Sequence, residues 1–298
     1  MTTGDAVRTS GQPVLGSMSV DRISRVRGRL SMATQLAPRP NVTSGALDPA
    51  TRSTSTGDSE LLPRAPLTPR IAVALHDVSK VYPNGRRALA DVDLVILEGD
   101  FVFLVGPSGA GKSTLVRLLV RDEVPTSGEV FVAGSELSRL DSRAIPKLRR
   151  QIGIVFQDFR LLPRKTVREN VAFALEVTGT PRRRIGPAVD RVLALVGLSD
   201  QAEQRPSQLS GGEQQRTAIA RAMVHDPKVI IADEPTGNLD PLISWEILQL
   251  LLRINEMGTT VLIATHNAEV VTALRKRVVG LEEGRLVRDE VGGYHRDS

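Results

Sequence analysis

The chain has 298 residues, a formal net charge of +5 and no cysteine, with 24% charged and 3% aromatic residues. This length suits one or two domains. The absence of cysteine excludes a disulfide framework and thiolate chemistry, and the scarcity of aromatic residues argues against a nucleic-acid binder that stacks bases. No apolar run approaches the ~20 residues of a membrane span, and no secretory signal is visible. We expect a cytoplasmic protein unless a partner holds it at a membrane.

Residues 1–70 differ from the rest of the chain, because they contain no aromatic residue and no lysine and are rich in Arg, Pro, Ser and Thr. Such a composition buries too little apolar surface to offset the entropy of ordering, which predicts a disordered extension. Within it, residues 20–30 place apolar residues at helical spacing among arginines. This piece is either a weak membrane-surface helix or a solvated basic tail, and the internal Gly28 favours the tail. A start codon further downstream is a third interpretation.

From residue 71 the pattern predicts a small antiparallel β subdomain. Residues 71–82 favour a strand with a bend, residues 83–85 a turn, and residues 89–97 alternate as a strand with one buried face. Tyr82 precedes the turn, and the local sequence supports two roles equally: a platform that stacks on adenine, or a core tyrosine at the end of a strand.

A phosphate-binding loop is the strongest motif. Residues 101–105 are continuously apolar, as in a parallel strand buried on both faces, and a helix is predicted over 114–121. Between them, residues 106–113 fit G-x-x-x-x-G-K-[ST] at every fixed position. The predicted nucleotide-binding residues here are Gly106, Pro107, Ser108, Gly109, Ala110, Gly111, Lys112, Ser113 and Thr114.

The chemistry of a bound triphosphate explains these residue types. Glycines let the backbone curl and direct its N–H groups inward, and the helix N-terminus adds partial positive charge. Lys112 supplies a point charge for the β- and γ-phosphates, and the Ser113 hydroxyl supplies a ligand to Mg²⁺. The alternative is a glycine-rich turn that binds nothing.

A helical block follows. Strands are predicted over 128–132 and 152–156, the second ending at Gln157, with a short basic helix over 145–150 between them. Apolar residues recur at helical spacing over 167–177 and 188–196. These helices predict an inserted subdomain over about residues 158–225.

The next helix start carries two extra glycines. Ser210 and Glu213 form a capping-box pattern that predicts a helix to about residue 225. Gly211 and Gly212 are more than a cap requires. They suit a phosphate that approaches the backbone at the positive end of the helix.

Two later strands end in polar residues. Residues 229–234 form a buried strand that ends in Asp233 and Glu234, and paired carboxylates at such a position indicate a metal or catalytic role. A turn with Asp240 follows, and residues 260–265 predict another buried strand, ending at His266. Residues 278–282 and 285–289 predict a closing hairpin, with a frayed tail from 292.

The ordered set of these motifs, over about residues 71–291, resembles the nucleotide-binding domain of ABC ATPases. The resemblance implies an α/β P-loop NTPase fold: a RecA-like parallel sheet with a small antiparallel β subdomain and an inserted helical subdomain. It implies that Tyr82 stacks on adenine and that Asp233 holds Mg²⁺ through water. Glu234 would orient and deprotonate the attacking water, Gln157 would sense the γ-phosphate and metal, and His266 would contact the γ-phosphate.

The resemblance also implies a homodimer in the ATP state. In this family the residues matching Ser210, Gly211, Gly212 and Glu213 serve the ATP of the opposite subunit, and the residue matching Asp240 communicates across the interface. One chain carries one phosphate loop and one such helix, so a complete site requires two chains.

Less widespread residues indicate a subfamily. Residues 156–163, 166–175 and 284–289 resemble the FtsE subfamily of cell-division ATPases. That resemblance implies ATP and Mg²⁺ as cofactors, an FtsX-like integral membrane partner at the cytoplasmic face, other division proteins, and a cell-wall hydrolase activated through the membrane partner. The segment after Gln157 would receive the partner's coupling helix. No nucleic-acid partner is expected.

Two other functions remain open. The chain suits the motor of a lipoprotein-release or efflux transporter, which shares the same core. It also suits a division scaffold that binds ATP and turns it over very slowly.

Overall fold

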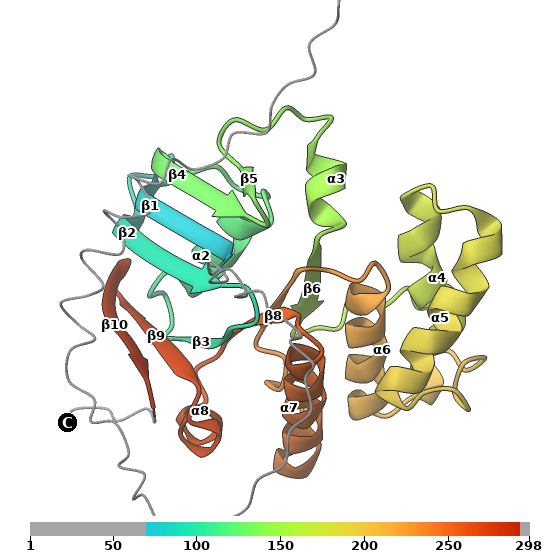
Figure 1. Ribbon diagram of the computed structural model, residues 1–298. Coiled ribbons are helices and arrows are strands. Elements are labelled where there is room, and N and C mark those ends of the chain that lie inside the picture. The colour runs from blue at the N-terminus through green and yellow to red at the C-terminus, as the bar shows by residue number, and fades with distance from the viewer. Residues whose placement is uncertain (1–69, 293–298) are drawn as a thin grey trace, which may run out of the picture. The chain divides into compact units, whose positions relative to one another are not determined.

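The computed structural model describes residues 70–292, which form two sheets and the helices around them (Figure 1). The predicted disordered extension over 1–70 lies outside the described residues apart from its last residue, and so does the helical piece at 20–30. The predicted tail over 292–298 lies outside them apart from its first residue. Among the described residues, no helix is both long enough and apolar enough to cross a membrane.

An antiparallel sheet confirms the predicted β subdomain. Its strands have the order β2-β1-β4-β5. They are β1 (Ile71–Val81), β2 (Arg87–Leu97), β4 (Ser127–Val132) and β5 (Ser135–Glu136). The predicted bend in β1 is at Asp77, whose φ is 48°, where the register against both neighbouring strands shifts.

The second sheet has the order β10-β9-β3-β8-β7-β6 and is parallel except for β10. Its strands are β3 (Phe101–Val105), β6 (Ile152–Phe156), β7 (Val229–Asp233), β8 (Thr260–Ala264), β9 (Arg277–Glu282) and β10 (Arg285–Val291). Every residue of β3 and β8 is buried, which explains their continuous apolar sequence. Ala264 pairs with Leu104 on one side and Asp233 on the other. The loops that follow β3, β7 and β8 therefore emerge at the same edge.

The helices are α2 (Lys112–Leu119), α3 (Ile145–Arg149), α4 (Val167–Val177), α5 (Arg182–Val196), α6 (Gly211–Met223), α7 (Pro241–Glu256) and α8 (Ala268–Leu274), with a 3₁₀ turn at Pro206–Gln208. Helices α4, α5 and α6 pack on one another, as expected for the helical block (Figure 1). Its boundaries at 158 and 225 stay a prediction. Helices α7 and α8 were not predicted.

Two hydrophobic clusters lie on opposite faces of β3. Phe101, Phe103 and Val105 belong to the cluster that includes residues of α4–α7. Val102 and Leu104 belong to the other, with residues of α2 and of the antiparallel sheet. The strand that precedes the phosphate loop is therefore packed against hydrophobic residues on both of its faces.

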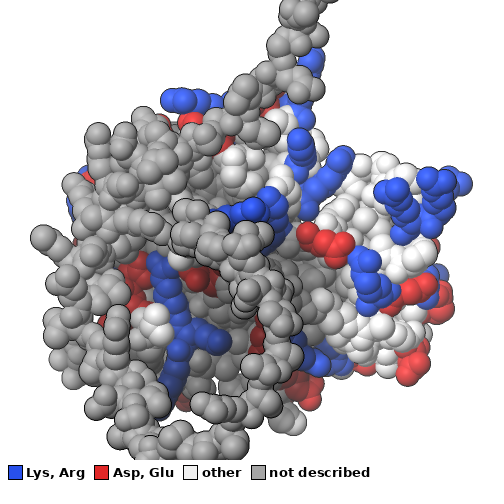
Figure 2. All heavy atoms as spheres, viewed as in Figure 1, with Lys and Arg blue, Asp and Glu red and all other residues white. Residues whose placement is uncertain are grey.

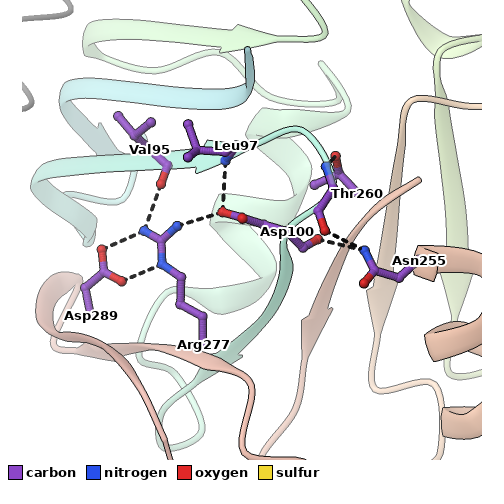
Figure 3. A network of polar contacts seen from close by, with 8 residues as sticks. Val95, Leu97, Asp100, Asn255, Thr260, Arg277 and Asp289 are labelled. Carbon is purple, nitrogen blue, oxygen red and sulfur yellow. Dashed lines mark hydrogen bonds and ion pairs between the residues drawn. The ribbon is translucent and has the colours of Figure 1, made fainter. Parts of the chain in front are cut away.

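A polar network joins the two sheets at the start of β3 (Figure 3). Arg277 on β9 forms ion pairs with Asp289 at 2.7 Å and Asp100 at 3.0 Å, and donates to the Val95 carbonyl at 2.8 Å. Asp100 also accepts the Leu97 N–H at 3.0 Å. Burial alone would lower the pKa of Arg277, but Asp289 and Asp100 raise it above its ordinary value.

Candidate functional site: a phosphate-loop cavity

The loop between β3 and α2 adopts a conformation that requires its glycines. Gly106, Gly109 and Gly111 have φ values of 152°, 81° and 111°. A Cβ on Gly106 would lie 2.2 Å from the Leu281 carbonyl oxygen, and one on Gly111 would lie 2.6 Å from that of Ala88. The expected curled backbone is therefore present, because only glycine tolerates both the dihedral angles and the contacts.

The β9–β10 turn supports the phosphate loop through backbone hydrogen bonds. The Gly284 N–H donates to the Ala110 carbonyl at 3.0 Å, and the Ala90 N–H donates to the Gly284 carbonyl at 2.8 Å. A Cβ on Gly284 would lie 2.7 Å from the Ala88 carbonyl oxygen. The turn thus fits closely between β2 and the phosphate loop.

A cavity of about 870 Å³ opens over the loop. Its lining includes residues 106–114 apart from Ala110, together with Tyr82, Asp233, Glu234 and His266. Lys112 Nζ donates to the carbonyls of Gly106 at 2.7 Å and Pro107 at 3.1 Å. The structure therefore brings together the predicted phosphate-binding loop, both carboxylates and the histidine.

Tyr82 lies at the edge of this cavity rather than in the core. Its ring is partly exposed, and its hydroxyl lies 3.3 Å from Thr114 Oγ1. Lys80 Nζ lies 5.2 Å from the ring centroid. This position favours the platform over the core tyrosine, and its contact with adenine stays a prediction.

Glu234 and His266 form a close pair. His266 Nδ1 lies 2.7 Å from Glu234 Oε1. Because an ionised carboxylate only accepts hydrogen bonds, Nδ1 donates and Nε2 is left for a ligand. The backbone of Glu234 has a φ of 49°, and its N–H donates to the Ala264 carbonyl at 2.8 Å. The carboxylate is therefore held at a fixed place by an unusual backbone conformation.

Asp233 is partly buried, and its surroundings shift its pKa. Burial raises its pKa above the ordinary value, the nearby Glu234 raises it further, and Lys112 and Arg117 oppose these effects. Asp233 and Ser113 both line the cavity. Carboxylate and hydroxyl oxygens are ligands that suit Mg²⁺, so these two residues fit a metal bound beside phosphates.

Gln157 is the predicted metal and γ-phosphate residue that does not line the cavity. Its Nε2 donates to Asn238 Oδ1 at 3.2 Å, and Asn238 Nδ2 donates to its carbonyl at 3.0 Å. The side chain is thus fastened to the turn that precedes α7. Its role toward metal and phosphate stays a prediction.

The residues expected to serve the opposite subunit also lie outside the cavity. Ser210 caps α6 and forms the predicted capping box with Glu213, whose pKa is lowered by hydrogen bonds from Ser210. Asp240 caps α7 by accepting the N–H groups of Leu242 and Ile243, each at 3.1 Å. The lining of the phosphate-loop cavity of the same chain includes neither residues 210–213 nor Asp240.

The structure adds a packing reason for the glycine pair. A Cβ on Gly212 would lie 2.6 Å from Ile243 Cγ2, and one on Gly211 would lie 3.1 Å from Leu239 Cδ2. Gly212 is therefore needed where α6 meets the start of α7. The approach of a phosphate to these glycines stays a prediction.

Two cationic residues of the cavity were missed by sequence reasoning: Arg86 and Arg117. Arg117 follows Ser113 by four residues in α2, so helical spacing could have placed both on one face. Arg86 lies in the turn after Tyr82, and no motif marks it.

Comparison with known proteins defines the class. A family profile described as ABC transporter matches residues 89–237. The solved dimeric structure of an ATP-binding cassette in a post-hydrolysis state, bound to ADP and Pi, has a TM-score of 0.67 and 38% identity, covering 75% of this chain and 100% of that chain. The chain belongs to the ABC transporter family of ATPases, and it binds and hydrolyses ATP. The predicted P-loop NTPase fold is confirmed.

Two curated relatives at more than 50% identity carry the same name. The cell division ATP-binding protein FtsE of Mycobacterium tuberculosis is 56% identical over 224 residues, covering 75% of this chain and 97% of that protein. FtsE of Streptococcus pneumoniae is 54% identical over 223 residues, with the same two shares of 75% and 97%. The predicted resemblance to FtsE is confirmed.

Proposed function

We propose that two copies of this chain close on two ATP molecules, each held between the phosphate loop of one copy and the α6 N-terminus of the other. One observation carries this proposal: the cavity contains the phosphate loop, whereas Ser210 and Asp240 of the same chain lie outside it. The dimeric ADP- and Pi-bound relative supports it.

Mixing two inactive variants tests the shared site. Lys112→Ala removes the phosphate-loop cation, and Ser210→Arg blocks the α6 N-terminus. We expect each alone to lose ATP turnover. Their mixture should regain about one quarter of wild-type turnover, because random pairing in a symmetric dimer makes about half of the dimers mixed, each with one intact site. Phosphate release measures this result.

Thr166→Arg is the matched control, because Thr166 and Glu169 form the same capping box on α4, away from the cavity. It should keep turnover, which would show that loss of a cap does not explain Ser210→Arg. A mixture as inactive as its parts would contradict the shared site.

Within each site, the residues have distinct roles. Lys112 transfers its hydrogen bonds from loop carbonyls to the β- and γ-phosphates. Ser113 and, through water, Asp233 would hold Mg²⁺, and the ion would supply positive charge beside the phosphates. Glu234 orients and deprotonates water for attack on the γ-phosphate. His266 orients Glu234 through Nδ1, at 2.7 Å from its carboxylate, and contacts the γ-phosphate through Nε2.

We further propose that the chain is the ATPase of an FtsE–FtsX-type complex at the cytoplasmic face of the membrane, where its cycle activates a cell-wall hydrolase through the membrane partner and engages other division proteins. The names and the 54–56% identity of the FtsE relatives support this proposal.

A basic surface lies at the start of α5, where three consecutive arginines are exposed: Arg182, Arg183 and Arg184. Figure 2 shows basic side chains gathered where α4 joins α5. Such a surface suits a position beside anionic headgroups.

The segment after Gln157 is fixed by hydrogen bonds from two helices, which suits it to partner binding. Arg221 on α6 donates to the carbonyls of Phe159 at 2.9 Å and Arg160 at 2.6 Å. Burial lowers the pKa of Arg221. Asn170 on α4 accepts the Leu162 N–H at 2.7 Å and donates to the Leu162 carbonyl at 3.1 Å. The loop is thus held in one conformation before a partner docks, which reduces the entropy cost of binding.

Capture from solubilised membranes tests the partner. The full chain carrying Glu234→Gln, loaded with ATP, should retain a membrane protein with an external domain, together with a cell-wall hydrolase or division proteins. Leu161→Asp, in the partly exposed loop, should lose that protein while ATP affinity is unchanged. Capture of a permease with a solute- or lipoprotein-binding component would instead favour the transporter motor, and no membrane protein would refute the partner assignment.

A further inference from the structure

Arg86 lies in the tight turn that joins β1 to β2. The Tyr82 N–H donates to the Arg86 carbonyl at 2.9 Å, and the Gly85 N–H donates to the Tyr82 carbonyl at 2.9 Å. The Arg86 N–H donates to Asn84 Oδ1 at 3.1 Å. The backbone of Arg86 is therefore fixed relative to Tyr82, the residue predicted to stack on adenine.

The Arg86 side chain reaches over the phosphate loop. Its Nη2 lies 3.5 Å from the Gly109 carbonyl oxygen, and a Cβ built on Gly109 would lie 3.4 Å from the same nitrogen. Arg86 lines the same cavity as Lys112. The guanidinium of Arg86 therefore lies beside the phosphate loop, whose N–H groups are expected to bind phosphate.

Among the residues that the structure describes, Arg86 differs from its neighbour Arg87 in its surroundings. Within residues 70–292, no carboxylate pairs with it, whereas the next residue, Arg87, pairs with Asp91 at 3.2 Å and does not line the cavity. Two adjacent arginines of one hairpin thus have different surroundings. One has a structural partner, and the other faces the nucleotide cavity.

We propose that Arg86 binds the polyphosphate of the nucleotide. Its planar fork of N–H donors matches phosphate oxygens, and hydrogen bonds between ionised groups are stronger than neutral ones. The turn over residues 82–86 then holds both ends of ATP, with Tyr82 on the base and Arg86 on the phosphates. This inference rests on ATP binding in the phosphate-loop cavity.

The test compares Arg86→Ala, Arg86→Lys and Arg87→Ala in the full chain, with Mg²⁺ present. Affinities for ATP and for inorganic tripolyphosphate are measured by calorimetry or by competition. We expect Arg86→Ala to weaken both by the same factor, about tenfold. Arg86→Lys should recover part of the loss, because it keeps the charge without the fork. Arg87→Ala should bind both ligands as the wild type does.

Two results would overturn the inference. One is wild-type affinity of Arg86→Ala for ATP. The other is weaker ATP binding with unchanged tripolyphosphate binding, which would assign the effect to the base. Lys112→Ala separates this inference from the proposed site. If Lys112→Ala binds ATP normally as well, the cavity does not bind the nucleotide, whereas an effect of Lys112→Ala alone refutes only the role of Arg86.

Discussion

Glu234→Gln should keep ATP binding and lower turnover by roughly 10²–10⁴-fold, the usual effect of removing a general base. The amide preserves the size of the side chain, and its oxygen can still accept the hydrogen bond from His266 Nδ1, which lies 2.7 Å from Glu234 Oε1. The change therefore removes proton acceptance with little change in shape. Turnover is measured by phosphate release and binding by calorimetry.

Glu269→Gln is the matched control, because Glu269 is an exposed acid in the first turn of α8 and does not line the cavity. It should leave turnover unchanged. Near-wild-type turnover of Glu234→Gln would remove Glu234 from the role of base. Rescue of cell division by Glu234→Gln would favour the scaffold function, in which ATP binding suffices.

Arg277→Met should lower the free energy of unfolding by roughly 3 kcal/mol, because removing one partner of a largely buried ion-pair network leaves its acids unpaired. Asp289 and Asp100 have 14% and 30% of their side-chain surfaces exposed. For a domain of this size the loss corresponds to a melting temperature lower by about 6–12 °C. Denaturant and thermal unfolding measure both quantities.

Arg285→Met is the control on the neighbouring strand. Arg285 lies 3.6 Å from Asp91, and both side chains are more than half exposed. The expected change is below about 1 kcal/mol, as for exposed ion pairs. Adding Asp289→Leu to Arg277→Met should recover part of the loss, since it removes a carboxylate left without its partner. Equal effects of Arg277→Met and Arg285→Met would contradict the importance of the network.

The sequence pattern predicted those helices and strands that are marked by residues close together in the chain, such as a capping box or an apolar run. The capping box at Ser210 and the apolar strand at 101–105 appear in the structure as expected, and the strand predicted over 229–234 ends one residue earlier, at Asp233. Helix α7 was missed although Asp240, as N-cap, precedes Pro241 and an apolar series at helical spacing. Asp240 was predicted to be an interface residue, and the structure shows that it also caps this helix.

Long-range contacts could not be predicted in this way. Periodicity does not reveal that Gly212 meets Ile243, because the contact depends on how α6 crosses the start of α7. Arg86 carries no motif, and its position in the cavity follows from the register of β1 and β2 and from the turn that joins them. The same limit applies to Arg277, whose partners Asp100 and Val95 are more than 170 residues away in the chain.

The support of the phosphate loop by the β9–β10 turn has a consequence for synthesis of the protein. The Gly106 Cα faces the Leu281 carbonyl so closely that a Cβ would lie 2.2 Å from it, and the Gly284 N–H donates to the Ala110 carbonyl at 3.0 Å. The loop leaves the ribosome well before the turn that holds it. A nascent chain that ends before residue 284 therefore lacks this support for its phosphate loop.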